Sequence, residues 1–573
     1  MYVPEEDVMA QPPLPCTHVG ARVPVKVPLA AAAAGSTPGP ALPPDPGAGE
    51  NPPPPRAHAR AGARPDGPVP VRVVLTKLDT PGPTVTGTRG HAMKRRKEVV
   101  MSSTDNSPPG SSPAGVHAAQ PSRRDFLRKA GTAGVVLGSA SALLSACSTV
   151  AGVGGGKKSS GGTIKILLWS HFVPRYDTWF DPWAKAWGQK NGVTVIVDHI
   201  NQADLPARTA AEFAAGAGHD LIEWITPASA YEPSVHDLTD VVTQAQAKYG
   251  DQVSFCKLSS YNPHTHKYYA FCHTWTPDPG DYRKGLWTKA GMANGPATYD
   301  DLLTGGTEIY TKQHVRMGIG MSPEVDSNMA ARALIWSYGG SVQDAQGNVT
   351  LNSPEVVDAV TYMAKLFKQT MTSEVFGWTA ASNNQGLVAG QLSYILNSIS
   401  AYRTAQTTTA SVANDIFFVP ALKGPSGKGL ASQHVVRSYM VPKWASNVDK
   451  AKQFLLDLVG AAHSAVYNSE LYDFPAFSST GAASALPGWL QNDPFGSKPA
   501  SKLALLASAQ QWTTNVGYPG AANAAIGEIF TTNVLPTMMA SAAQGKASPK
   551  DAVASAATQC EAIFSKWRAK GLV

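Results

Sequence analysis

Tryptophan is absent from the first 146 residues, although the 573-residue chain contains 13 tryptophans. The same segment holds 24 of the 45 prolines, including the run Pro52–Pro55. A segment of this composition buries too little apolar surface to offset the entropy that folding costs. We therefore expect residues 1–121 to be a disordered or untranslated leader, with Met93 and Met101 as candidate translation starts.

Charged residues are also scarce, at 16% of the chain against about 25% in typical globular domains. Residues 1–146 contain 16 Lys+Arg and 10 Asp+Glu, whereas the remainder contains 32 and 31. The net charge of +7 therefore belongs mostly to the leader, and we expect no nucleic-acid partner, which would favour basic residues on the folded part. No apolar run reaches the roughly 18 residues of a membrane span, which excludes a polytopic membrane protein.

Residues 122–147 have the features of an export signal. Arg123 and Arg124 are followed by Phe-Leu and by an apolar stretch rich in Gly, Ala and Ser, which is too short for a span but fits a signal peptide. The segment resembles a bacterial twin-arginine signal, and its end, Leu144-Ser145-Ala146-Cys147, resembles a lipoprotein box. The resemblance implies export and lipid anchoring through Cys147 to the outer face of the cytoplasmic membrane. The alternative is a buried helix followed by an ordinary cysteine.

The chain after this signal begins with a Gly-, Ser- and Lys-rich segment, residues 148–162, which we interpret as a flexible tether.

The chain has only five cysteines. Cys16 lies in the leader and Cys147 in the signal, so Cys256 and Cys272 are the natural disulfide pair of an exported protein, and Cys560 is left over.

Free thiols and a zinc site are the alternatives to this disulfide. Several zinc-compatible side chains fall within eighteen residues, namely Cys256, His264, His266, Cys272 and His273. Their spacing matches no zinc motif, so we expect neither a metal nor a cofactor.

From residue 163 onward, apolar runs alternate with helical patterns. Residues 164–169, 193–197 and 218–224 are predicted strands, and the segments between them have helical periodicity. The tryptophans at 179, 183 and 187 share one helix face, which favours core packing over binding. Strands that alternate with helices indicate an α/β fold with parallel strands, in which ligands lie beyond the carboxyl ends of the strands.

Residues 163–573 resemble the extracellular solute-binding proteins of ABC importers, and within them the sugar-binding, maltose-binding-protein-like family. The resemblance rests on the order and spacing of several motifs. These motifs are Lys267-Tyr268-Tyr269-Ala270-Phe271, Gly285-Leu286-Trp287-Thr288-Lys289-Ala290-Gly291, Gly390-Gln391-Leu392-Ser393-Tyr394-Ile395-Leu396-Asn397, Val419-Pro420-Ala421-Leu422-Lys423-Gly424-Pro425 and Gly545-Lys546-Ala547-Ser548-Pro549.

This resemblance implies two α/β lobes, each a sheet flanked by helices, with a hinge between them. The first lobe would comprise residues 163–275 and 421–474, and the second residues 281–418 and 475–573. It also implies a monomer that binds a sugar or oligosaccharide between the lobes and delivers it to ABC permease subunits.

A sugar site needs flat aromatic surfaces for C–H faces and polar groups for hydroxyls. The chain places candidates of both kinds near predicted strand ends and turns. The aromatic candidates are Trp224, Trp275, Tyr402, Trp512 and Tyr518, and the polar ones are His171, Glu223, Asp278, Asn397 and Arg437. Core packing is the alternative for the aromatic residues, and a surface salt bridge is the alternative for Arg437.

A glycan-processing enzyme and a surface sensor are the alternative functions. Glu223 and Asp278 could form a carboxylate pair for glycoside cleavage, but no spacing supports such a pair. The chain contains neither Gly-x-Ser-x-Gly nor His-Glu-x-x-His. We therefore expect a binding protein with no catalytic residues.

Overall fold

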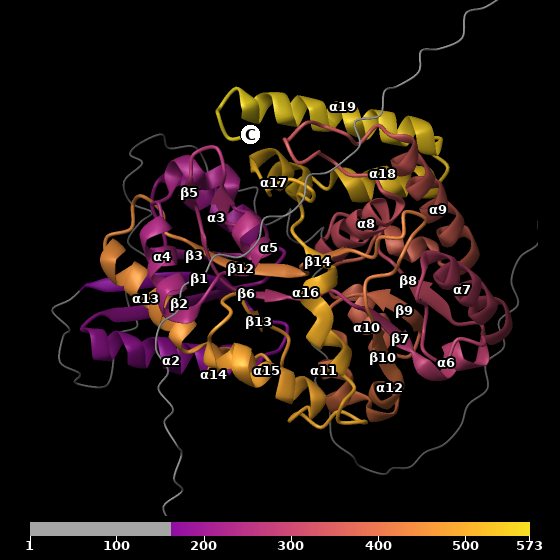
Figure 1. The fold of residues 1–573 in the computed structure, drawn as a ribbon, viewed down its shortest axis with the longest axis horizontal. Helices are drawn as coiled ribbons and strands as arrows, with labels where there is room; N and C mark the ends of the chain where they lie inside the picture. Colours follow the sequence, from indigo (N-terminus) through magenta and orange to yellow (C-terminus); the bar gives the residue numbers. More distant parts are fainter. Residues whose placement is uncertain (1–161) are drawn as a thin grey trace, which may run out of the picture. The chain divides into compact units, whose positions relative to one another are not determined.

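The computed structural model describes residues 162–573 (Figure 1). The predicted leader at 1–121, the export signal with Arg123 and Arg124, the lipidation site Cys147 and nearly all of the tether at 148–162 lie outside the described residues. Among the residues that are described, no helix is both long and apolar enough to cross a membrane.

A six-stranded sheet with the order β13-β6-β12-β3-β1-β2 forms the centre of the first lobe. β1 is parallel to β2 and β3, whereas β12 is antiparallel to both β3 and β6. The predicted alternation of strands and helices is confirmed here, because β1 is an apolar run whose residues are buried from Ile166 to Trp169. The strands are β1 (Thr163–Trp169), β2 (Thr194–Ile200), β3 (Leu221–Trp224), β6 (Phe271–Thr276), β12 (Val435–Met440) and β13 (Phe474–Pro475).

Helices flank this sheet on its two faces (Figure 1). Trp187 is buried, and Trp179 and Trp183 pack against the same core, so the prediction of core packing is confirmed. Trp183 and Trp187 both contact the ring of Phe454. The helices are α2 (Arg175–Asn191), α3 (Leu205–Ala215), α4 (Thr239–Tyr249), α5 (Ser254–Leu258), α13 (Val448–Gly460), α14 (Ala462–Asn468) and α15 (Gly481–Gln491).

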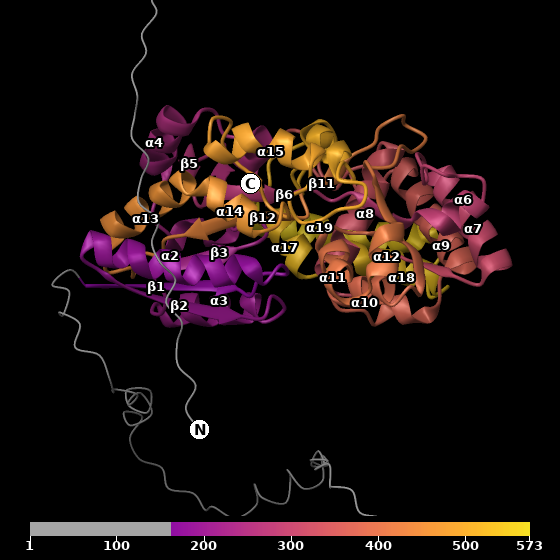
Figure 2. The same cartoon turned by 90° about the horizontal axis from the view of Figure 1, so that it is seen from below.

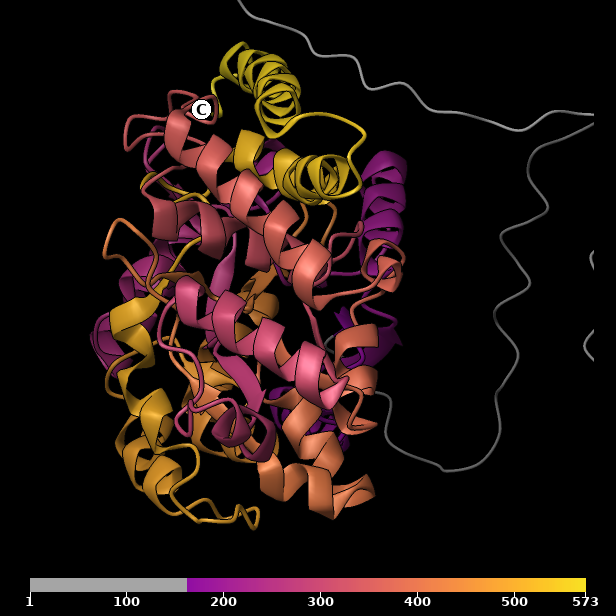
Figure 3. The same cartoon turned by 90° about the vertical axis from the view of Figure 1, so that its right-hand side faces the viewer.

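The second lobe contains a four-stranded sheet with the order β10-β7-β9-β8. Its strands are β7 (Gly280–Arg283), β8 (Arg316–Gly318), β9 (Leu392–Leu396) and β10 (Ile416–Val419). Figure 3, in which this lobe faces the viewer, shows long helices covering the sheet, with the yellow C-terminal helices above them. The helices are α6 (Lys284–Lys289), α7 (Tyr299–Gln313), α8 (Val325–Tyr338), α9 (Pro354–Thr370), α10 (Ser382–Val388), α11 (Ser400–Thr408), α12 (Ala410–Asp415), α17 (Ala524–Thr531), α18 (Val534–Ala543) and α19 (Pro549–Arg568).

The chain passes between the lobes at residues 277–279, between β6 and β7, again between β10 and β12, and a third time between α15 and α17 (Figure 2). The second passage carries β11 (Ala431–Ser432), which pairs with β14 (Thr513–Thr514) on the third. These passages bring residues from both lobes into one region. The remaining short elements are β4 (Tyr261–Asn262), β5 (Lys267–Tyr268), η1 (Ser229–Ser234), η2 (Ser373–Phe376), η3 (Ala504–Ser508) and α16 (Ala509–Trp512).

Candidate functional site

A cavity of about 370 Å³ lies between the two lobes. The first lobe contributes the segment that leads into α3 and the residues at the end of β3. The second lobe contributes the start of α8, the segment after η2, and the junction of α17 with α18. The lining residues are Gln202, Ala203, Leu205, Pro206, Trp224, Ile225, Thr226, Pro323, Glu324, Val325, Asn328, Trp378, Thr379, Ala380, Phe530, Thr531 and Asn533.

Three aromatic rings give this interlobe pocket its flat apolar surfaces. Trp224 is the last residue of β3, and its ring packs edge-to-face on Tyr231 with centroids 5.8 Å apart. Trp378 packs against the apolar cores of both lobes, and Phe530 lies at the end of α17. The pocket therefore has aromatic groups from both sides.

A glycine makes room for Trp378. A Cβ atom on Gly318 would lie 2.5 Å from the Trp378 ring, closer than atoms can approach. The carbonyl of Trp378 also accepts a hydrogen bond of 2.8 Å from the Ser322 hydroxyl. Trp378 is thus held by a close ring-to-backbone approach and by one hydrogen bond.

Arg332 supports the wall formed by α8 and α17. Its guanidinium lies 4.9 Å from the centroid of the Phe530 ring and donates to Asn328 Oδ1 at 2.9 Å. Asn328 in turn donates to Asn533 Oδ1 at 2.8 Å. Burial lowers the pKa of Arg332 to about 9, a cost that its contacts with Phe530 and Asn328 offset in part. Asn328 and Asn533 are therefore oriented groups at the pocket wall.

A buried acidic cluster lies directly behind the start of α8. His434 Nδ1 is 3.0 Å from Asp278 Oδ1, and its Nε2 is 3.6 Å from Asp326 Oδ1. Burial lowers the pKa of His434, but the carboxylates of Asp278, Asp326 and Glu324 outweigh it and leave the pKa raised. Through its imidazole ring, His434 on the second passage contacts both Asp278 on the first passage and Asp326 in the second lobe.

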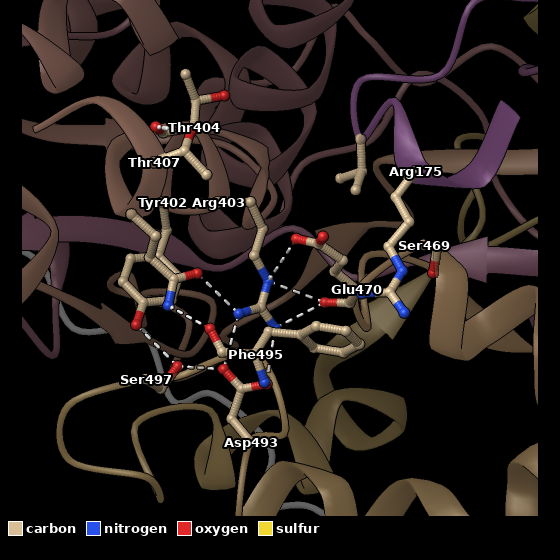
Figure 4. A network of polar contacts seen from close by, with 12 residues as sticks. Arg175, Tyr402, Arg403, Thr404, Thr407, Ser469, Glu470, Asp493, Phe495 and Ser497 are labelled. Carbon is tan, nitrogen blue, oxygen red and sulfur yellow. Dashed lines mark hydrogen bonds and ion pairs between the residues drawn. The ribbon is translucent and has the colours of Figure 1, made fainter. Parts of the chain in front are cut away.

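A separate polar network ties α11 of the second lobe to the turn before β13 (Figure 4). Arg403 makes two bonds to Asp493, of 2.7 and 3.1 Å, and two to the Glu470 carbonyl, of 2.9 and 2.7 Å. Arg175 stacks over Phe495 at 5.1 Å. Because Arg403 is almost fully buried, these bonds satisfy a charge that would otherwise be costly.

Residues 182–495 match the family model for bacterial extracellular solute-binding proteins. The chain belongs to this family. Curated relatives match over a shorter segment: a binding protein of Brucella abortus (strain 2308) is 31% identical over 88 residues, which is 15% of this chain and 20% of the relative. The chain thus aligns with only a fifth of that relative's length.

Solved structures extend the likeness of this solute-binding protein to the fold. Maltose-bound MalE3 of T. maritima has a TM-score of 0.58 and 18% identity, over 70% of this chain and 99% of that one. A ribitol-bound ABC transporter solute-binding protein of Agrobacterium radiobacter K84 has 0.58 and 19%, over 71% and 100%. A laminaribiose-bound sugar transporter of Arthrobacter chlorophenolicus A6 has 0.59 and 16%, over 70% and 99%. The predicted two-lobed fold is confirmed.

Of the ten predicted binding residues, Trp224 lines the pocket of the solute-binding protein. Asp278 belongs to the acidic cluster behind the pocket. Asn397 follows β9, donates its side-chain amide to Asn384, and donates its backbone N–H to the carbonyl of Pro279 at 3.3 Å. The turn after β9 therefore lies beside the first passage between the lobes, and the binding role of Asn397 stays a prediction.

Three of the polar candidates instead form an ion network inside the first lobe. Arg437 contacts Glu223 Oε1 at 2.7 Å through Nη2 and Asp473 Oδ2 at 2.9 Å through Nη1, and none of the three side chains is exposed. His171 Nε2 is 3.2 Å from Asp473 Oδ2. Burial opposes the charge of Asp473, but Arg437 and His171 hold its pKa below the usual range. These three candidates therefore take part in a network inside the first lobe, and none of them lines the pocket.

Trp275 and Tyr402 are also internal, which corrects their prediction as stacking surfaces. Trp275 is completely buried between Phe255 and Phe474, because β6 lies inside the sheet between β12 and β13. Tyr402 is buried on α11, where its hydroxyl donates to Ser497 at 2.8 Å.

The last two predicted aromatics lie outside the pocket lining. Trp512 is buried at the end of α16, and its Nε1 donates to the Ser508 hydroxyl at 3.3 Å. The partly buried Tyr518 packs edge-to-face on Trp336, with ring centroids 5.8 Å apart. Neither ring faces the aromatic walls that Trp224 and Trp378 form.

The predicted disulfide is not formed in the structure, where Cys256 and Cys272 are buried free thiols. Burial raises the pKa of the Cys256 thiol, and its hydrogen bond with Cys272 raises it further. Within residues 162–573, no group of three or more His, Cys, Asp or Glu side chains is arranged to hold a metal ion.

Sequence reasoning missed Trp378 and Phe530. Helices α17 and α18 are separated at Asn533, which adopts a left-handed φ of 56°. The sequence carries a signal for this break, because Thr531-Thr532-Asn533 precedes Pro536 and proline is tolerated in the first turn of a new helix. Phe530 and Asn533, which lie at this break, both line the pocket.

Proposed function

We propose that this solute-binding protein captures a sugar or an oligosaccharide in the interlobe pocket and presents it to the permease subunits of an ABC importer. The observation that carries the proposal is the pairing of aromatic walls from both lobes with oriented amides. Trp224 stands on one side and Trp378 on the other, so a ring held between them favours closure of the lobes. Sugar C–H faces suit such rings, and hydroxyls suit Asn328 and Asn533.

The two carboxylates that could have formed a catalytic pair are each bound to another side chain, which supports binding rather than catalysis. Glu223, the candidate acid for glycoside cleavage, is buried and paired with Arg437. Asp278, its candidate partner, is paired with His434. A cleaving enzyme needs two carboxyls on either side of the scissile bond, and neither of these residues lines the pocket.

Export and anchoring are part of the proposal. Arg123 and Arg124 would direct export, and lipidation of Cys147 would hold the protein on the outer face of the membrane. A C147S variant is expected to leave the membrane fraction and appear in the medium or periplasm. Full retention of C147S in washed membranes would contradict the anchor and leave the sugar proposal untouched.

The sugar proposal is tested by titration calorimetry with neutral mono- and oligosaccharides on the protein truncated before residue 163. The W224A and W378A variants are expected to bind about ten- to hundredfold more weakly, since each removes one large apolar contact of about 1–3 kcal/mol. The matched control is W489A, because Trp489 packs on His463 and Tyr467 on α14. Equal losses in W489A and W378A, or no binding of any sugar by the unmodified protein, would refute the proposal.

A further inference from the structure

The acidic cluster behind the pocket draws its members from three parts of the fold. Asp278 lies on the first passage between the lobes, and His434 on the second passage, just before β12. Asp326 lies in the first turn of α8, in the second lobe. His434 touches both carboxylates, at 3.0 Å from Asp278 and 3.6 Å from Asp326. Any group that binds these carboxylates therefore contacts the hinge and the second lobe together.

The cluster contains more carboxyl groups than cationic partners. Within residues 162–573, His434 is the only cationic side chain that the structure pairs with Asp278 or Asp326. Glu324 lies beside Asp326, and the neighbouring Asp281 is fully buried with both carboxylate oxygens free of hydrogen bonds. Burial raises the pKa of Asp326, Glu324 and Asp281, which favours their neutral forms, and an added positive charge nearby would oppose that shift.

Three buried oxygen atoms in the cluster have no hydrogen-bond partner. They are Asp278 Oδ2, Asp326 Oδ1 and the hydroxyl of Tyr472. Tyr472 comes from the first lobe, is completely buried, and packs edge-to-face on His434 with ring centroids 6.2 Å apart. Burial raises the pKa of Tyr472, and Asp473, Asp326 and Asp278 raise it further, so its hydroxyl lies within the field of both cluster carboxylates. Buried polar atoms of this kind are normally satisfied.

The cluster adjoins the pocket through α8. Glu324 and Val325 line the pocket, and Asp326 is the next residue along the chain. Asn383 occupies Asp326 Oδ2 at 2.8 Å, which leaves Oδ1 as the free oxygen. The cluster thus begins one residue beyond the pocket wall.

We propose that the ligand carries a protonated amine that binds Asp278, Asp326 and Tyr472, so that the substrate class is an aminated sugar. The inference rests on the proposed sugar-binding function and deepens it. An ammonium group has three N–H donors and one positive charge, which matches three free acceptors and carboxyls whose only cationic partner among the described residues is His434. A neutral hydroxyl supplies one donor and no charge. A metal ion does not fit, because the described residues contain no group arranged to hold one.

The test compares matched sugars that differ only in the amine. Glucosamine with glucose, and the β-1,4 dimer of glucosamine with cellobiose, are titrated by calorimetry near neutral pH. The unmodified protein is expected to bind the aminated member of at least one pair about tenfold or more tightly, by the scale of charged hydrogen bonds. N-acetylglucosamine, which lacks the charge, is expected to behave as the neutral sugar does.

Variants assign the preference to the cluster. D326N and D278N keep the side-chain shape and are expected to lower the affinity for the aminated sugar about tenfold or more, with the neutral affinity changed less than about threefold. Y472F, which removes only the free hydroxyl, tests the same site with less risk to folding and is expected to weaken amine binding several-fold. D300N, an exposed acid on α7, is the control and is expected to leave both affinities unchanged.

The outcomes separate this inference from the proposed function. Neutral sugars that bind as tightly as aminated ones, or an amine preference that survives in both D326N and Y472F, overturn the amine site and leave sugar binding intact. Failure of every sugar to bind the unmodified protein overturns both proposals.

Discussion

The interlobe pocket, with the cluster behind it, and the ion network of the first lobe are built from the same kinds of residues, yet only the pocket presents its side chains to a cavity. Around Arg437, opposite charges are paired inside the lobe, because the guanidinium contacts Glu223 Oε1 and Asp473 Oδ2, and His171 contacts the same oxygen of Asp473. In and behind the pocket, aromatic faces line a cavity, and His434 is the only cationic side chain that the described residues pair with Asp278 and Asp326. The difference shows that residue type alone does not distinguish a ligand-binding side chain from a structural one. What distinguishes them is whether other side chains already pair with the group and whether it lies at a cavity.

The largest expected effect comes from breaking the ion network. An R437M variant would leave Glu223 and Asp473 buried with only His273 and His171 beside them, and loss of one partner of a buried ion pair costs about 3–5 kcal/mol. We expect the free energy of unfolding, measured by urea denaturation at neutral pH, to fall by this amount.

The control for this variant is K312A, which breaks an exposed pair with Glu308 on α7. Such pairs contribute only about 0.3–0.5 kcal/mol. If R437M were as stable as K312A, the network would not be structural, and the comparison drawn above would fail.

An intermediate effect is expected from filling the space beside Trp378. In G318A, the new methyl group would meet the Trp378 ring at 2.5 Å and Leu392 at 2.7 Å, so the ring must move. Overpacking costs about 1–3 kcal/mol of stability, and we expect the sugar affinity to fall about three- to tenfold by calorimetry, which is at most about 1.4 kcal/mol. G488A on α15, where a Cβ meets nothing within 4 Å, should change neither quantity adversely.

The smallest expected effect is on the pH dependence of stability, which should have opposite signs for His434 behind the pocket and for His273 in the first-lobe network. The pKa of His434 is raised in the folded protein, so its contribution to stability is present below pH 6.5 and lost as the pH rises through the folded pKa. Burial lowers the pKa of His273, near Glu223 and Arg437, so its contribution is present above pH 6.5 and lost as the pH falls. Each dependence is at most about 1.4 kcal/mol per pH unit.

The measurement compares the unfolding free energies of H434Q and H273Q with that of the unmodified protein between about pH 5 and pH 8. The destabilisation by H434Q should shrink as the pH rises, and that by H273Q should shrink as the pH falls. Trends of the same sign in both variants would show that the two clusters do not differ electrostatically in the way proposed.

Much of the secondary structure could be predicted because its causes are local. The apolar run of β1 was sufficient to predict a buried strand. Ser353, directly before Pro354, caps α9 by accepting from the N–H of Val356, which is a local signal of the same kind. Asp204 shows the limit of such local signals. It stands at the N-cap of α3 but makes no capping hydrogen bond, because its own backbone is already helical.

The candidate site was less predictable. Trp224 could be found because it ends a strand whose carboxyl end faces the pocket. Trp275 lies near the end of β6, but its ring is enclosed by Phe255 of α5 and Phe474 of β13. Sequence spacing does not reveal which side chains pack around a strand-end aromatic, and that packing decides whether its ring lines a pocket or fills the core.

The sequence by itself determined the family, the alternation of strands and helices, and the chemistry available to a sugar site, since these depend on periodicity and residue type. Only the tertiary structure decided which polar residues face one another. Arg437 met Glu223 and Asp473 across separations of 214 and 36 residues, and Trp378 met Trp224 from the other lobe. The physical reason is that burial and pairing energies depend on distances in space, and a chain that passes three times between the lobes brings remote segments together.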